Sequence, residues 1–253
     1  RPQTMHVVDT TVFFSPTSGG VKRYLMAKHA WYAAHTPWRH TLLVPGEREQ
    51  FAPGGLSTLR GIKVPGTFNY RLPIDPPRWS AMLAALEPDL IEVGDAFHPA
   101  WCAAQVAQRR GIPLVAFFHS NLPQLVTQRM GTAIGAGFAR YVRWLYARFD
   151  AVLAPSRYMR DYLRSLGVTR VICQPLGVDV ETFNPAQRTL DVRRELGLGE
   201  DTRLLVFAGR FSGEKNLPVL FEAFARLGKP YHLLLIGGGE AKSFAPNVTA
   251  IPY

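Results

Sequence analysis

A pair of adjacent glycines near the start of the chain could bring the backbone close to a negatively charged ligand. Gly19 and Gly20 close the segment 15–20, which separates an apolar run from a helical pattern. Glycine lets the backbone approach a ligand closely, and the N-terminus of the following helix offers unpaired N–H groups and a partial positive charge. The pair therefore predicts an anion site suited to a pyrophosphate. A plain glycine turn before a helix is the alternative.

A later loop carries two cations. Arg210 and Lys215 lie in the segment 209–216, which follows an expected strand and leads into a helical pattern. A guanidinium can fork onto phosphate oxygens and an ammonium adds a point charge. The loop therefore predicts stabilisation of a leaving diphosphate. The alternative is a solvated Arg210 and a Lys215 that pairs with Glu214.

A histidine and an aspartate follow two further apolar runs. His119 comes directly after Pro113–Phe118, and ligands of open α/β sheets bind outside the carboxyl ends of the strands. His119 is therefore a candidate for ligand contact, with a histidine satisfied by backbone groups in a turn as the alternative. Asp179 lies in a corner that contains Pro175 and Gly177, where a capping role is favoured over a catalytic one.

Alternating strands and helices must position these residues. Short apolar runs without a clear period are typical of strands buried on both faces, and their alternation with helical patterns predicts a doubly wound parallel α/β sheet. We expect strands at Met5–Val8, His40–Val44, Leu90–Val93, Pro113–Phe118, Ala151–Ala154 and Val171–Gln174. We expect helices to begin near Gly20, Arg78, Ala100, Phe138 and Ser156.

A stretch without strong periodicity, ending near residue 186, divides this pattern. The alternation then restarts with strands at Leu204–Ala208, Leu233–Ile236 and Val248–Ile251 and a helix at Leu217–Leu227. We therefore expect an N-terminal domain of residues 1–186 and a second domain of residues 187–253. Because the second pattern holds fewer strands than the roughly five or six of a typical sheet, we expect this second domain to be incomplete.

The charge balance is strongly basic. The 253 residues include 29 Lys and Arg against 19 Asp and Glu, for a net charge of +10. This excess suits phosphate-bearing ligands, an anionic membrane or nucleic acid, but the chain has no basic tract interleaved with aromatic residues, so we expect no nucleic-acid partner. Cys102 and Cys173 form neither a metal-ligand spacing nor a disulfide framework, which fits a reducing cytoplasm. No signal peptide or membrane-spanning stretch is visible, so any membrane contact should be peripheral.

One segment has two contrasting faces at helical spacing. Its expected core stripe consists of Phe138, Tyr141, Val142, Leu145, Tyr146 and Phe149. The opposite face carries Arg140, Arg143, Trp144 and Arg148. A basic face with a tryptophan is typical of a helix that lies on a membrane surface. A solvated surface with a half-covered tryptophan is the alternative.

These motifs, in this order, resemble the retaining glycosyltransferases of family 4. The resemblance rests on Gly19-Gly20-Val21-Lys22-Arg23-Tyr24, Phe118-His119-Ser120, Ala154-Pro155-Ser156, Gly177-Val178-Asp179 with Phe183-Asn184-Pro185, and Gly209-Arg210 with Glu214-Lys215-Asn216. It implies the GT-B fold, in which two Rossmann-like domains face a cleft, with the second domain truncated here. It also implies a hexosyltransferase that uses a nucleoside diphosphate sugar of the UDP or GDP type, with a lipid or a sugar as acceptor.

The resemblance also implies residue roles. Gly19 and Gly20 would bind the donor diphosphate across the cleft from Arg210 and Lys215, and His119 would stabilise charge near the anomeric centre. Gly237 and Gly238 would form a donor-side loop. The loops Thr10–Ser18, Asp95–His98 and Asn121–Gly137 would shape the acceptor site, with Asp95 and Asn121 as candidate contacts. The family usually works without a bound metal or other cofactor, so we expect neither.

One departure from the family pattern concerns a glutamate pair further into the second domain, which lies beyond Tyr253. We therefore expect residues 1–253 alone to lack turnover. Two other classes of function are also compatible with the sequence. One is a non-catalytic module that binds a sugar nucleotide or a lipid head group. The other is a nucleic-acid-binding protein, which the composition does not favour.

Overall fold

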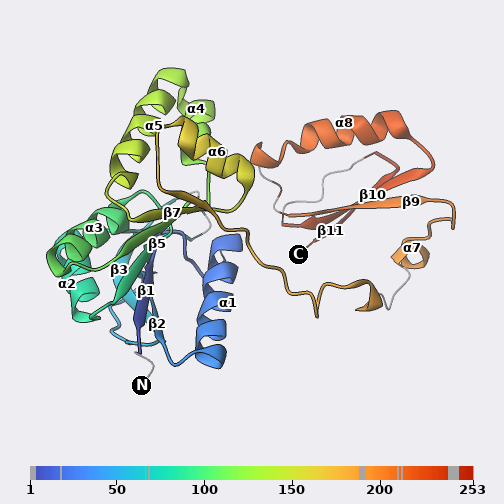
Figure 1. The fold of residues 1–253 in the computed structure, drawn as a ribbon. Helices are drawn as coiled ribbons and strands as arrows, with labels where there is room; N and C mark the ends of the chain where they lie inside the picture. Colours follow the sequence, from blue (N-terminus) through green and yellow to red (C-terminus); the bar gives the residue numbers. More distant parts are fainter. Residues whose placement is uncertain are drawn as a thin grey trace. The chain divides into compact units, whose positions relative to one another are not determined.

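A computed structural model describes residues 4–252, apart from residues 18, 66, 68, 188–191, 210, 212 and 239–244. The chain divides into two compact units, Arg1–Gly177 and Val178–Tyr253. Both units are built from strands that alternate with helices (Figure 1). Each unit is described by itself below.

The first unit is built on an eight-stranded sheet with the strand order β4-β3-β2-β1-β5-β6-β7-β8. Neighbouring strands are parallel, except that β3 and β4 are antiparallel. The strands are β1 His6–Thr10, β2 Arg39–Gly46, β3 Leu56–Lys63, β4 Arg71–Pro73, β5 Leu90–Val93, β6 Leu114–Phe117, β7 Ala151–Ala154 and β8 Val171–Cys173. The helices are α1 Gly20–His35, α2 Pro76–Ala85, α3 His98–Arg110, α4 Leu122–Met130, α5 Thr132–Tyr146 and α6 Arg157–Ser165.

Helices cover both faces of this sheet. On one face α1 packs through Leu25 against Leu42 and Val44 of β2. The larger core lies on the other face, where α2 contributes Trp79 and Leu83 to a cluster that also contains side chains of α3, α5 and α6. Figure 1 shows α1 on the opposite side of the sheet from α2 and α3. The central parallel strands β1, β2, β5 and β6 are therefore buried on both faces, as is typical of such strands.

Several elements depart from the sequence-based expectation. The strands β3 and β4 and the helix α4 are not among the expected elements, and α5 begins at Thr132 rather than near Phe138. The first turns of α5 contain Ala133, Gly135 and Gly137, which supply no apolar stripe. The later part of α5 does show the expected core stripe, because Val142, Leu145 and Tyr146 are buried there.

The second unit contains a three-stranded parallel sheet with the order β11-β10-β9. Its elements are the short helix α7 Val192–Glu195, β9 Arg203–Ala208, α8 Leu217–Leu227, β10 Tyr231–Gly237 and β11 Val248–Pro252, with 3-10 turns at Pro185–Gln187 and Gly213–Lys215. Phe224 of α8 packs against Leu233 and Leu235 of β10.

The division between the units lies before the domain boundary expected near residue 187. The segment 178–187 belongs to the second unit, and its hydrogen bonds are local, as in the bond from the N–H of Phe183 to the carbonyl of Asp179. Asp179 caps this turn, because its carboxylate accepts hydrogen bonds from the N–H groups of Glu181 and Thr182 at 3.1 and 3.0 Å. The capping role expected for Asp179 is therefore confirmed.

Candidate functional site

The turn that leads from β1 into α1 is open. Gly19 is the N-cap of α1, no side-chain cap is found among the described residues, and the first turn of the helix carries no acidic residue. A Cβ atom built on Gly19 or Gly20 would meet no other atom of the described chain within 4 Å. Packing within the chain therefore does not require glycine here. The N–H groups of the first helical turn, which have no partner within the helix, and the helix dipole suit an anion that approaches the backbone.

His119 lies at the same carboxyl edge of the sheet, two residues beyond the end of β6. Its ring stacks on Phe117 at 4.3 Å between ring centres, and Tyr24 of α1 packs edge-on against it at 5.1 Å. Its Nε2 atom is buried and has no hydrogen-bond partner among the described residues. Burial lowers the pKa of His119 to about 4, because a charged imidazole would lose its hydration there.

The loop after β5 supports this histidine. A Cβ atom on Gly94 would lie 3.1 Å from the side chain of Thr11 and 3.4 Å from Cδ2 of His119. The absence of a side chain at Gly94 therefore gives the ring its room. Gly94 is not among the candidate residues inferred from the sequence, although a glycine directly after a buried strand is a signal of close approach.

Asp95 and Asn121, the candidate acceptor contacts, both hold backbone in place. The Asp95 carboxylate is buried and accepts hydrogen bonds from the N–H groups of Val12 at 2.7 Å and Phe97 at 2.8 Å. Asp95 therefore ties the loop after β1 to the loop after β5. Asn121 caps α4 through the N–H of Gln124 at 3.2 Å. Both residues lie at the carboxyl edge, and their contact with an acceptor stays a prediction.

A buried ionic network lies between α1 and the strands behind this edge. Lys28 of α1 contacts Asp9 of β1 at 3.0 Å and Glu92 of β5 at 2.8 Å. Nε2 of His40 in β2 contacts the second oxygen of Asp9 at 3.1 Å, and the hydroxyl of Tyr24 donates to Glu92 at 3.4 Å. The network therefore links α1, which carries the Gly19-Gly20 turn, to three adjacent strands.

The two carboxyl groups of this network, Asp9 and Glu92, have pKa values that are shifted in opposite directions. Burial and the nearby Asp9 carboxylate raise the pKa of Glu92 to about 7, although Lys28 opposes this shift. Burial alone would raise the pKa of Asp9, but Lys28 and His40 outweigh it, so this pKa is lowered. Sequence reasoning missed the network. The available signal was the presence of carboxylates inside strands buried on both faces, where an unpaired charge is costly.

In the second unit, the loops after β9 and β10 lie side by side. The N–H of Gly209 donates to the carbonyl of Ile236 at 2.9 Å, and that of Phe211 donates to Gly238 at 3.2 Å. A Cβ atom on Gly237 would lie 1.8 Å from the carbonyl oxygen of Gly209, so only glycine fits there. Lys215 ends the first of these loops and is exposed. Arg210 lies outside the described residues.

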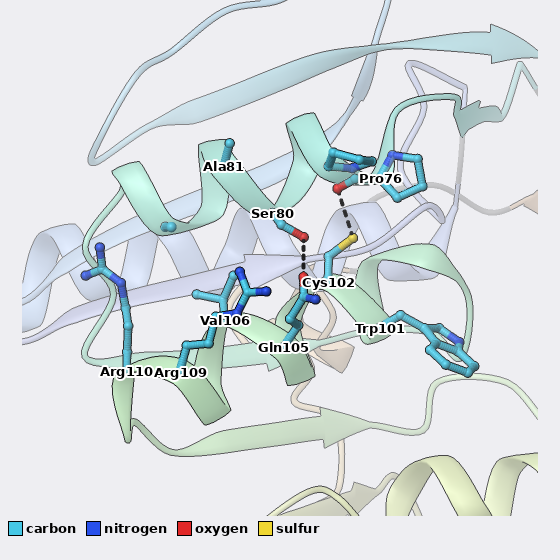
Figure 2. A pocket seen from close by; sticks show the side chains of 11 residues that line it. Pro76, Ser80, Ala81, Trp101, Cys102, Gln105, Val106, Arg109 and Arg110 are labelled. Carbon is cyan, nitrogen blue, oxygen red and sulfur yellow. Dashed lines mark hydrogen bonds between the residues drawn. The ribbon is translucent and has the colours of Figure 1, made fainter.

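A separate groove of about 710 Å³ opens between α2 and α3. Figure 2 shows Trp101 near one end of this groove and Arg109 and Arg110 at the other. The thiol of Cys102 donates to the carbonyl of Pro76 at 3.4 Å across it. None of the residues expected to bind donor or acceptor lines this groove. The groove is therefore distinct from the candidate residues at the carboxyl edge.

Comparison with known proteins places the chain in a family. Residues 18–182, more than half of the chain, match the sequence profile of Glycosyltransferase Family 4. The chain belongs to glycosyltransferase family 4. The resemblance inferred from the sequence motifs is thereby confirmed.

Two curated relatives of this family 4 chain are also glycosyltransferases. A GDP-mannose-dependent alpha-(1-6)-phosphatidylinositol dimannoside mannosyltransferase from Mycobacterium tuberculosis is 29% identical over 247 residues, which cover 94% of this chain and 64% of that protein. A sulfoquinovosyl transferase from Arabidopsis thaliana is 27% identical over 170 residues, which cover 66% of this chain and 33% of that protein. The chain thus spans less than two thirds of the length of either relative. The expectation that residues 1–253 alone lack turnover finds no support in these matches.

A solved structure shows the fold. Sucrose-phosphate synthase from Thermosynechococcus elongatus superimposes with a TM-score of 0.72 at 18% identity, covering 98% of this chain and 70% of that one. This likeness confirms the expected α/β fold class of the GT-B type. In the described part of the chain, no helix is long and apolar enough to cross a membrane.

Proposed function

We propose that this family 4 chain belongs to a retaining glycosyltransferase that transfers a hexosyl group from a nucleoside diphosphate sugar to a lipid or sugar acceptor. One observation carries the proposal. The carboxyl edge of the first sheet combines a buried Nε2 of His119, which has no partner among the described residues, with the open Gly19-Gly20 turn. A buried polar atom without a partner in the chain calls for a partner from outside it. A sugar hydroxyl and a diphosphate are suitable partners for the two features.

In this proposal the residues have distinct roles. Gly19 and Gly20 contribute backbone N–H groups to diphosphate binding, and Arg210 and Lys215 contribute positive charge to it. His119 contacts the donor sugar as a neutral imidazole, with Gly237 and Gly238 in a donor-side loop. The unit 1–177 serves as the acceptor side and the following residues as the donor side. The mannosyltransferase relative is named for GDP-mannose, which supports a donor of the UDP or GDP type.

Proton transfer in this reaction does not require a carboxylate base from the chain. Retention follows if the acceptor oxygen bonds to the anomeric carbon on the face from which the diphosphate departs. The leaving phosphate oxygen then takes the acceptor proton. Among the described carboxylates near the edge, Asp9 and Glu92 contact Lys28, and Asp95 binds two backbone N–H groups. All three are therefore engaged, which supports a mechanism driven by electrostatic stabilisation of the diphosphate.

A metal-independent mechanism is part of the proposal. The described residues include no group of three or more His, Cys, Asp or Glu side chains that could hold a metal ion. In the proposal Arg210 and Lys215 neutralise the diphosphate charge instead. Dependence of turnover on a divalent cation would contradict this step.

A peripheral membrane position is also proposed, on the inner, cytoplasmic face. The basic face of α5 adjoins a pair of exposed tryptophans, because Trp144 lies 4.9 Å from Trp101 of α3 between ring centres. The two side chains are 42% and 48% exposed, respectively. The guanidinium of Arg148 lies 3.6 Å from the centre of the Trp144 ring. Indole rings beside arginines suit the boundary of an anionic bilayer.

A thermal-shift screen against UDP, GDP and ADP sugars tests the central proposal. A ligand that binds only the native state stabilises it by about 2.7 kcal/mol at a concentration one hundred times its Kd. We expect one nucleotide class to raise the Tm, and Lys215→Ala and Arg210→Ala to reduce that rise. Product analysis then distinguishes transfer from binding alone. Binding without transfer to any lipid or sugar acceptor would favour the alternative, a non-catalytic binding module.

A further inference from the structure

A second cavity lies beside the Gly19-Gly20 turn. It measures about 630 Å³ and is bounded by the loop after β1, the first turns of α1 and the ends of β2, β3 and β4. Its cationic lining residues are Lys22, Lys63 and Arg71, and Glu47 is its carboxylate. Lys22 lies two residues after Gly20, so this cavity adjoins the candidate donor site at the carboxyl edge.

The pairing of β3 with β4 places two of these cationic side chains next to each other. Lys63 and Arg71 are directly opposite in the antiparallel pair β3–β4, an arrangement that is destabilising for like charges. The guanidinium of Arg71 contacts Glu47 at 2.6 Å, but the Glu47 side chain is 85% exposed, so solvent screens this pair. Lys63 has no ion-pair partner within the described ranges. The site therefore carries positive charge that the described residues do not balance.

The third cation faces the same space. The ammonium of Lys22 donates to the carbonyl of Pro16 at 2.8 Å and lies 6.0 Å from the centre of the Phe14 ring. A carbonyl orients this ammonium without neutralising it. Three positive groups thus line the cavity with one exposed carboxylate among them, which suits an anionic ligand group.

The remaining wall is apolar and reaches solvent. Met26 is 44% exposed and Leu56 is 40% exposed, and both line the cavity together with Phe14 and Val44. Exposed apolar side chains inside a concave, charged site are typical of a surface that a ligand covers. The cavity therefore combines an anion-binding end with a surface for a hydrocarbon segment.

We propose that this cavity binds the phosphate of a lipid acceptor, with Lys63 and Arg71 on the phosphate and Met26 and Leu56 against the first part of its apolar chain. The proposal rests on the proposed function, because it assigns the acceptor class of the same transferase. It places the acceptor on the side of α1 where the Gly19-Gly20 turn would hold the donor diphosphate.

Calorimetric titration of the nucleotide-free protein tests this assignment with three probes. They are dihexanoyl phosphatidylglycerol below its micelle concentration, the zwitterionic dihexanoyl phosphatidylcholine, and glycerol 3-phosphate. We expect the anionic lipid to bind at least about tenfold more tightly than either other probe, the scale of one charge-assisted hydrogen bond or a few buried methylenes. Equal affinity for glycerol 3-phosphate would overturn the lipid assignment, because the apolar wall would then contribute nothing.

Charge variants locate the binding site. We expect Lys63→Glu to weaken binding of the anionic lipid about tenfold or more, and Glu47→Gln to strengthen it because Arg71 is released. Arg60→Glu is the matched control, since Arg60 lies on the same strand but lines a different cavity. Unchanged binding in Lys63→Glu, or an equal loss in Arg60→Glu, would overturn the proposal. Because no nucleotide is present, a failed nucleotide screen would count against the proposed function and leave this result intact.

Discussion

At the scale of single residues, His119 allows a contribution to function to be measured apart from a contribution to folding, because its Nε2 has no partner among the described residues. The imidazole is held between Phe117 and Tyr24, so its ring contributes to packing, while the nitrogen contributes no bond within the described chain. A phenylalanine keeps a stacked ring and removes the nitrogen. The two contributions of His119 can therefore be measured independently.

We predict that His119→Phe loses most transferase activity and keeps its Tm at neutral pH. Removing one interaction made in the transition state commonly lowers kcat by about a hundredfold or more. As the pH falls from about 6.5 to 4, the free energy of unfolding of the variant should decrease less than that of the native protein. The folded-state pKa of about 4 lies below the ordinary value of 6.5, so in the native protein His119 costs stability as the pH falls through this window. Full activity in His119→Phe, measured with the donor found by thermal shift, would contradict the assigned role.

Titration of Glu92 should lower the stability of the native protein as the pH rises, whereas titration of His119 lowers it as the pH falls. Its folded-state pKa of about 7 lies above the ordinary value of 4.5. The native state therefore holds a proton that the unfolded state has lost, and stability falls as the pH rises from about 4.5 to 7. We predict that Glu92→Gln, which keeps an oxygen for Lys28, shows a smaller decline of Tm over this interval. Parallel Tm-versus-pH curves for the variant and the native protein would show that Glu92 does not titrate there.

At the scale of elements, the parallel order of the strands explains why separate motifs converge. The segments that follow β1, β5 and β6 carry Gly19-Gly20, Asp95 and His119, and these three strands are consecutive neighbours in the sheet. The carboxyl ends of parallel strands meet at one edge, so a strand prediction is also a prediction of this convergence. The sequence was informative here because β1, β5 and β6 are short apolar runs.

The elements that sequence reasoning missed have weaker local signals. The strand β3 buries Ser57, Leu59 and Gly61, so its alternation of burial is not an alternation of apolar side chains. The strand β4 has only three residues and ends in Pro73. These two strands build the cavity beside α1, so the cavity could not be predicted either. The network of Lys28, Asp9 and Glu92 was missed for another reason, because pairing of charges on a helix and two strands depends on tertiary contact.

The two glycine turns predict contrasting effects of one added methyl group. Gly237→Ala should displace the loop after β9, because the new Cβ would lie 1.8 Å from the carbonyl oxygen of Gly209. Such overpacking typically costs about 1–3 kcal/mol. Gly19→Ala should change stability by less than about 0.5 kcal/mol, since its Cβ would meet no neighbour. The Gly19 variant should instead weaken the nucleotide-induced shift in Tm. An unaltered shift would remove Gly19 from the diphosphate site.

At the scale of the whole molecule, the net charge of +10 favours association with anionic surfaces. Net charge alone does not orient the protein on a membrane, which requires a local feature such as the exposed Trp101–Trp144 pair. This pair is held in place by hydrogen bonds: Trp101 donates from Nε1 to the hydroxyl of Tyr141 at 2.7 Å, and that hydroxyl donates to the carbonyl of Ala96 at 2.6 Å. The aromatic patch is thus bonded to the loop after β5, at the carboxyl edge. A bilayer that contacts this patch would lie against α3 and α5.

Liposome flotation of a double variant tests this orientation. We predict that Arg140→Glu with Arg148→Glu lowers recovery with anionic vesicles, because each basic residue near such a surface contributes about 1 kcal/mol. Arg143 is left unchanged, since its Nε would lie 2.8 Å from a Cβ atom on Gly167 and so packs against that turn. The control is Arg109→Glu with Arg110→Glu, which makes the same change in net charge at the far end of α3 (Figure 2). If both variants lose recovery equally, attraction is set by net charge and the α5 face has no special role. If the Arg140 and Arg148 variant alone loses recovery, while neutral vesicles bind neither protein, the membrane contacts the α5 face.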